Sequence, residues 1–69
     1  MRKYGNPEVG KLYKVLEHFV PNDDIPREVG IGLCLESLVE GPRNHFGSVF
    51  LMNEQEGWFD NSYYEYIPV

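Results

Sequence analysis

The stretch GWFDNSYYEYI, residues 57–67, decides the fold that this sequence predicts. Aromatic and β-branched residues favour a pleated, half-buried surface, and here they form two short runs, at 57–59 and 64–68. Each run is expected to be a strand. Trp58 and Phe59 are neighbours, and neighbouring side chains on a strand point to opposite faces of the sheet. At most one of the two rings is therefore expected to be fully buried.

Outward from this stretch, the chain divides into further short apolar segments. Seven glycines and five prolines interrupt it, and the segments between them are shorter than the ~10–12 residues of an ordinary helix. We expect three more strands, at residues 11–20, 30–38 and 48–52. The proline-containing segments 20–29 and 39–47 are expected to be loops, because proline removes a ladder hydrogen bond from a sheet interior.

The polar run NEQEG, residues 53–57, predicts a hairpin turn between the third and fourth strands. Asn53 and Gly57 suit such a turn because both residue types tolerate positive φ. With this turn in place, the sequence predicts an all-β fold of five strands.

One alternative is a helix over residues 8–19, with Asn6-Pro7 at its start. Its apolar residues at helical spacing are Val9, Leu12, Tyr13, Leu16 and Phe19. As a strand, the same segment is apolar on both faces, as expected where a strand curls in a small barrel. One face carries Leu12, Leu16 and Val20, the candidate core side, and the other carries Tyr13, Val15 and Phe19.

A chain of 69 residues holds a single domain, here residues 1–69 with 1–8 as a candidate flexible N-terminal arm. Its one cysteine, Cys34, is expected to be a small buried hydrophobe in a reducing compartment. The sequence spacing of His18, Cys34 and His45 does not match that of known metal-ligand motifs, so no metal or other cofactor is expected. No nucleophile motif or phosphate loop occurs, so we expect no catalytic residue and no enzyme.

The charge is uneven along the chain. Residues 1–14 carry four basic residues against one acid, whereas residues 15–69 carry two against ten, and the net charge is −5. Phosphate binding needs a clustered basic face, so neither nucleic acid nor an anionic membrane surface is an expected partner. No apolar run approaches the ~20 residues of a membrane span, and the N-terminus is unlike a signal peptide. The expected location is the cytoplasm.

Residues 52–67 resemble the end of an SH3 domain. That family closes with a distal hairpin, a Gly, an aromatic residue, an apolar residue, Pro-Ser-Asn-Tyr and a final strand of the form Val-Glu-x-Ile/Leu. The residues that match in register are Gly57, Trp58, Phe59, Tyr63, Glu65 and Ile67.

Two earlier segments extend the resemblance. Leu12-Tyr13 is similar to the start of the family's Ala-Leu-Tyr-Asp-Tyr motif, and Asp23-Asp24 is similar to the acidic loop that precedes its second strand. Over residues 9–69 the order of elements agrees. The resemblance implies an all-β, five-stranded SH3-like barrel.

The family's mechanism is recognition of an extended proline-rich segment, which loses little entropy on docking into an aromatic-lined groove. The aromatic residues of that groove that carry over are Tyr13, Trp58 and Tyr63. Asp23 and Asp24 would attract a basic residue of the ligand.

The sequence also departs from the family. The tryptophan that opens the third strand and walls the groove falls at Gly47, with Phe46 one place away. Val15, Asp60 and Ser62 replace the second tyrosine of the first motif and the proline and asparagine of the last turn. The resemblance therefore supports the fold more strongly than the ligand, since fold alone does not license function.

The leading hypothesis is a non-enzymatic module that binds a partner protein or peptide, as a monomer or weak homodimer of bacterial or phage type. The predicted binding residues are an aromatic patch of Tyr13, Phe46, Trp58 and Tyr63 with the acidic residues Asp23 and Asp24 beside it. Clustered exposed aromatics mark partner sites.

Two alternatives stay open. One is a small acidic inhibitor or nucleic-acid mimic that binds a host enzyme through Glu36, Glu40, Glu54, Glu56, Asp60 and Glu65. The other is a structural or accessory subunit without a site of its own. Salt distinguishes the first alternative from the leading hypothesis, because carboxylate-driven binding weakens steeply with ionic strength and aromatic packing does not.

Overall fold

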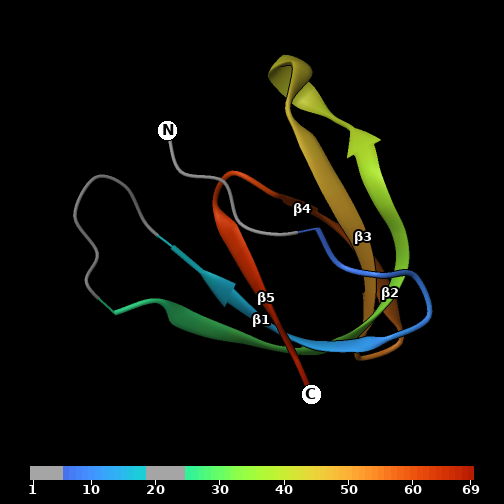
Figure 1. Ribbon diagram of the computed structural model, residues 1–69, viewed down its shortest axis with the longest axis vertical. Coiled ribbons are helices and arrows are strands. Elements are labelled where there is room, and N and C mark those ends of the chain that lie inside the picture. Colours follow the sequence, from blue (N-terminus) through green and yellow to red (C-terminus); the bar gives the residue numbers. More distant parts are fainter. Residues whose placement is uncertain (1–5, 19–24) are drawn as a thin grey trace.

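The computed structural model describes residues 6–18 and 25–69. These residues form one antiparallel sheet of five strands in the order β4-β3-β2-β1-β5 (Figure 1). The elements are β1 (Leu12–Glu17), β2 (Arg27–Glu40), a 3-10 turn η1 (Pro42–Asn44), β3 (Phe46–Met52), β4 (Gln55–Asp60) and β5 (Tyr64–Pro68). The predicted all-β class with five strands is confirmed.

The long strand β2 curves, so that β1 and β5 lie on one arm of the sheet and β3 and β4 on the other (Figure 1). The pairing register shifts opposite Val15/Leu16 and twice between Cys34 and Val39, and such irregularities bend and twist a strand. Leu38, inside the second irregular segment, has a φ of 58°. Among the described residues β4 and β5 are the two edges of the sheet, so no β4–β5 ladder closes a barrel.

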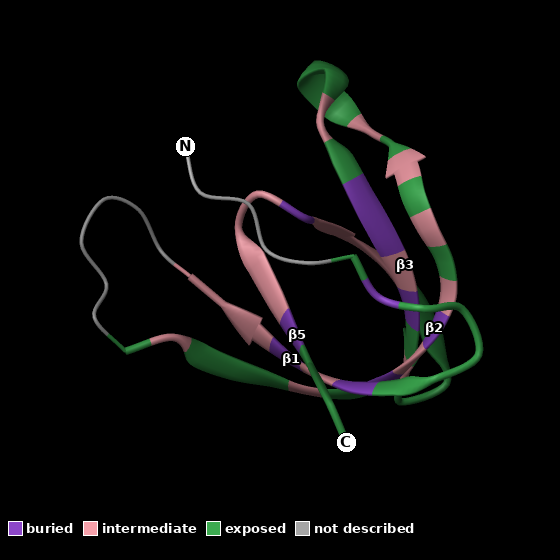
Figure 2. Cartoon of the chain, viewed as in Figure 1, coloured by how far each residue is buried: buried purple, intermediate pink, exposed green. Residues whose placement is uncertain are grey.

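Buried residues occur on β1, β2, β3 and β5 (Figure 2). The buried hydrophobic residues of the core are Tyr13, Val15, Cys34, Phe50 and Tyr66, with Met52, Phe59 and Tyr64 packed against them. Phe50 is at the centre, with ring centroids 4.9 Å from Tyr66, 5.9 Å from Phe59 and 6.1 Å from Tyr13. The expectation that Cys34 is buried is confirmed.

The predicted core side of the first strand is wrong. Tyr13 and Val15 face the core, whereas Leu12 is 51% exposed. Tyr13 lies opposite Gly32 and Val15 opposite Gly30 on the partner strand. A Cβ on Gly32 would lie 2.8 Å from the Met52 side chain and 3.2 Å from that of Phe50, so Phe50 and Met52 of β3 pack on this side of the sheet.

The elements differ from the predicted ones in several places. β2 extends to Glu40 and β3 begins at Phe46, so the predicted loop 39–47 is reduced to residues 41–45, and β4 is longer than the predicted 57–59. The helical alternative is wrong, because β1 is a strand paired on both sides with β2 and β5. β2 begins at Arg27 and not at residue 30. The β3–β4 turn consists of Asn53 and Glu54, with φ of 50° and 66°, so Gly57 lies inside β4.

The segment before β1 lies against the sheet. Pro7 is buried, the backbone N–H of Glu8 donates to the Tyr13 hydroxyl at 2.8 Å, and the Asn61 amide donates to the Asn6 Oδ1 at 3.2 Å. The backbone of Gly10 then bonds that of Cys34 at 2.8 Å. The Gly10–Cys34 hydrogen bond extends the β1–β2 pairing towards the N-terminus.

Candidate interaction surface

The described residues of the predicted binding site differ in how far they are exposed. Asp23 and Asp24 lie outside the described residues. Tyr13 is only 6% exposed and belongs to the core. Phe46 is 50% exposed at the start of β3, and Trp58 and Tyr63 are half-buried.

Trp58 is held in place by its surroundings. Its indole N–H donates to the Val39 carbonyl at 3.0 Å. A Cβ built on Gly41 or on Gly47 would lie 2.4 Å from the indole ring, so the ring packs closely against both glycines. The ring thus extends over β3 towards β2.

Tyr63 belongs to a polar turn between β4 and β5. His45 Nδ1 lies 2.6 Å from Asp60 Oδ2, and the other oxygen of Asp60 accepts from the backbone N–H of Ser62 at 2.8 Å. The ring centroids of His45 and Tyr63 are 6.0 Å apart. Since Asn61 N donates to the carbonyl of Phe46 at 2.9 Å, this turn and the exposed Phe46 lie at the same end of the sheet.

A buried polar network fixes this end of the sheet. Asn61 Oδ1 accepts from the Tyr66 hydroxyl at 2.7 Å and from the Ser48 hydroxyl at 3.0 Å, and the Tyr66 hydroxyl also lies 3.1 Å from the Phe59 carbonyl. Burial strongly raises the pKa of Tyr66, because the low-dielectric surroundings disfavour the phenolate. The network therefore requires a protonated Tyr66.

The raised pKa of Tyr66 predicts a loss of stability in alkali. The native state keeps this proton at a pH where the unfolded chain loses it, so the stabilisation is complete below pH ~10 and declines above it. At neutral pH Tyr66→Phe should cost about 1–2 kcal/mol of unfolding free energy, and the difference from wild type should narrow above pH ~10. Denaturant unfolding between neutral and alkaline pH measures both effects.

Tyr64 contributes to the same loss of stability at alkaline pH. Burial, and then the nearby Glu17 carboxylate, raises its pKa, so some alkaline sensitivity should survive in the Tyr66→Phe variant. Tyr63→Phe, in the β4–β5 turn, is the matched control. An equal loss of pH dependence in both variants would contradict the assignment to Tyr66.

An apolar surface lies on the opposite side of the sheet from the core. Because side chains alternate along a strand, the residues next to buried Tyr13 and Val15 point outward, together with their cross-strand partners. We name this surface the outer aliphatic face, and its residues are Leu12, Ile31, Leu33, Leu51, Ile67 and Val69.

The register brings these residues together from four strands. Leu12 pairs with Leu33, which pairs with Leu51, and the backbone N–H of Val69 bonds the carbonyl of Leu12 at 3.3 Å. In the next row Lys14 lies between Ile31 and Ile67. Exposure ranges from 37% for Leu51 to 74% for Val69, with Leu33 half-buried.

Sequence reasoning missed this surface. A signal was present, because residues 11–20 and 30–38 carry apolar side chains on both parities. That pattern is the same for a strand that is buried on both faces and for a strand with one apolar face exposed. The sequence therefore does not distinguish the two.

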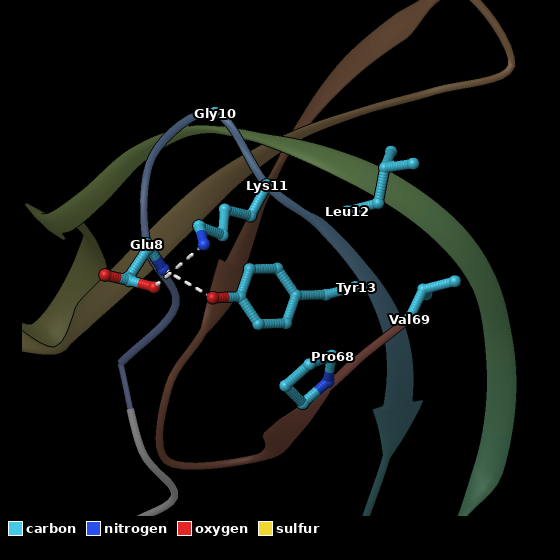
Figure 3. A pocket seen from close by; sticks show the side chains of 7 residues that line it. All are labelled: Glu8, Gly10, Lys11, Leu12, Tyr13, Pro68 and Val69. Atoms are coloured by element: carbon cyan, nitrogen blue, oxygen red, sulfur yellow. Dashed lines mark hydrogen bonds and ion pairs between the residues drawn. The ribbon is translucent and has the colours of Figure 1, made fainter.

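An open hollow of about 510 Å³ adjoins the outer aliphatic face (Figure 3). It lies where the segment before β1 meets the end of β5, and Leu12, Tyr13, Pro68 and Val69 line its apolar part. Lys11 Nζ and Glu8 Oε1, 3.8 Å apart, stand at its polar side. Leu12 and Val69 belong to both surfaces, so the hollow continues the apolar face.

The described residues show neither a group of metal ligands nor an activated thiol. No three His, Cys, Asp or Glu side chains among them gather as metal ligands. Burial raises the pKa of the Cys34 thiol, which disfavours the reactive thiolate. No helix in the described part of the chain is long and apolar enough to cross a membrane.

Comparison with known proteins adds no assignment: no protein-family model, curated protein or solved structure matches the chain.

Proposed function

We propose that this protein is a non-enzymatic interaction module with an SH3-like fold, and that it binds a partner protein through the outer aliphatic face. The fold assignment is supported by five antiparallel strands in the expected chain order and by the bend at β2. The observation that carries the function is the aliphatic face itself, which spans four strands.

An uncovered face of this kind favours association. Large exposed apolar patches on small proteins mark interaction sites. Covering ~300 Å² of apolar surface would contribute roughly 7 kcal/mol before the cost of association is subtracted. Lys14 lies between Ile31 and Ile67 on this face. Its positive charge can orient a partner that carries a carboxylate.

A photo-crosslinking experiment in cells of the source organism tests this proposal. A benzophenone amino acid replaces Ile31 on the face or, as the control, Glu40, which is exposed at the far end of β2. A discrete crosslinked partner should appear with the Ile31 probe only. Identical crosslinks from both positions would contradict the proposed face.

The same complex distinguishes the acidic-inhibitor alternative. Apolar binding should persist at ~1 M salt, whereas carboxylate-driven binding should be lost. Two of the six candidate carboxylates already have partners in the chain, since Asp60 pairs with His45 and Glu65 with His18. Ile31→Ser should release the partner at low salt, with the melting temperature confirming that the variant is folded.

A further inference from the structure

We propose that the free edge of β4 accepts an extended segment of a partner protein as an added antiparallel strand. The proposed segment places an apolar side chain beside Gly57 and a basic side chain beside Glu56. This second surface is separate from the outer aliphatic face and does not depend on it.

The hydrogen-bond parity of β4 shows which backbone groups are available. Asn61 N donates to the Phe46 carbonyl, so in this register the backbones of Gln55, Gly57 and Phe59 face β3. Those of Glu56, Trp58 and Asp60 face away from it. Among the described residues β4 has β3 as its single neighbouring strand.

Contacts among the described residues leave this edge accessible. The Trp58 ring leans over Gly47 and Gly41, across β3 and away from the edge. The Asp60 carbonyl is already used by the N–H of Tyr63 at 3.0 Å. The groups left for an added strand are therefore the N–H and C=O of Glu56 and Trp58 and the N–H of Asp60.

A hollow on the core side of β4 fits one apolar side chain. It measures about 210 Å³, and its lining includes Phe50, Met52, Phe59 and Gly57. Gly57 contributes no side chain, and directly paired residues share a face. A residue opposite Gly57 on an added strand would thus project into this hollow.

The acidic residues at the edge of β4 favour a basic partner segment. Glu56 is exposed on the outer side of β4, next to the exposed Glu54 in the turn, so a Lys or Arg opposite Glu56 is favoured. Self-pairing is disfavoured, because two antiparallel β4 strands centred on Trp58 would bring Glu56 of one copy against Asp60 of the other. Like charges at an edge protect it from self-association. The occupant is therefore a basic, alternating segment of a different protein.

A capped peptide, Thr-Val-Thr-Leu-Lys-Val-Thr, is the probe, with Leu opposite Gly57 and Lys opposite Glu56. The backbone amide signals of the full chain are followed by NMR during titration. Binding should slow hydrogen exchange at the N–H groups of Glu56, Trp58 and Asp60, and a peptide with Glu in place of Lys should bind at least tenfold more weakly. Slowed exchange along β5, or none on β4, would overturn the proposal.

Three variants test the individual contacts. Glu56→Pro removes an N–H that β3 does not use and should weaken peptide binding at least tenfold, whereas Glu56→Gln should weaken it a few-fold and reduce its salt dependence. Gly57→Ala adds a Cβ 3.4 Å from the Phe59 ring, an ordinary contact, and should weaken binding by filling the hollow. Unchanged binding in all three would overturn the proposal, and if Glu56→Pro does not fold, the exchange pattern of the wild type decides.

Discussion

Phe50→Ala is expected to remove a large part of the free energy of unfolding. Phe50 is fully buried, and its ring contacts those of Tyr13, Phe59 and Tyr66. Removing a buried phenylalanine costs about 3–5 kcal/mol. A chain of this size is expected to have roughly 3–10 kcal/mol of stability in total, at ~0.05–0.15 kcal/mol per residue. The Phe50 ring therefore contributes a large share of the total free energy of unfolding.

The neighbouring residue provides the control. Leu51 is adjacent on β3 but points outward and is 37% exposed, so Leu51→Ala should cost no more than about 1 kcal/mol. Circular dichroism during denaturant titration measures both variants. Equal losses would show that the core does not lie on the Phe50 side of the sheet.

Gly47→Ala should disrupt the β3–β4 ladder. A Cβ on Gly47 would lie 2.4 Å from the backbone carbonyl oxygen of Phe59 and 2.4 Å from the Trp58 ring. The ring can rotate away, but the carbonyl belongs to the paired strand and can move only with it. We expect a loss of about 3 kcal/mol or more, in the upper range of single substitutions.

Gly41→Ala separates the two causes. There the nearest atoms to an added Cβ all belong to the Trp58 ring, the closest at 2.4 Å, so the ring should be displaced while the strands remain paired. Trp58 is the sole tryptophan of the sequence, so its fluorescence should shift to the red in Gly41→Ala, with a smaller loss of unfolding free energy than in Gly47→Ala. Equal destabilisation by both variants would mean that the displaced ring, and not the carbonyl, sets the cost at Gly47.

The two proposed surfaces use different parts of the sheet. The outer aliphatic face draws on β1, β2, β3 and β5, whereas the strand-addition site uses the free edge of β4. Leu51 and Glu56 are cross-strand partners at their border. A basic strand beside Glu56 would therefore lie next to a partner on the aliphatic face.

Sequence reasoning located the strands because the signals for strands are local. Short apolar runs, Gly and Pro interruptions and the Asn53 turn depend on neighbouring residues alone, and the last strand occupies Tyr64–Pro68 as expected. The alternation of Trp58 and Phe59 is local as well, and Phe59 packs against the core. The SH3-like identity stays a prediction that these local features support.

Only the tertiary structure decided which side of each strand faces inward. β1 is apolar on both sides, and Tyr13 rather than Leu12 is buried because Phe50 of β3 and Tyr66 of β5 form the core on its side of the sheet. The half-burial of Trp58 likewise depends on Gly41 and Gly47. The sequence by itself thus determined that this is a five-stranded all-β protein. Long-range pairing determined where its apolar residues remain exposed, because burial depends on what the partner strands leave uncovered.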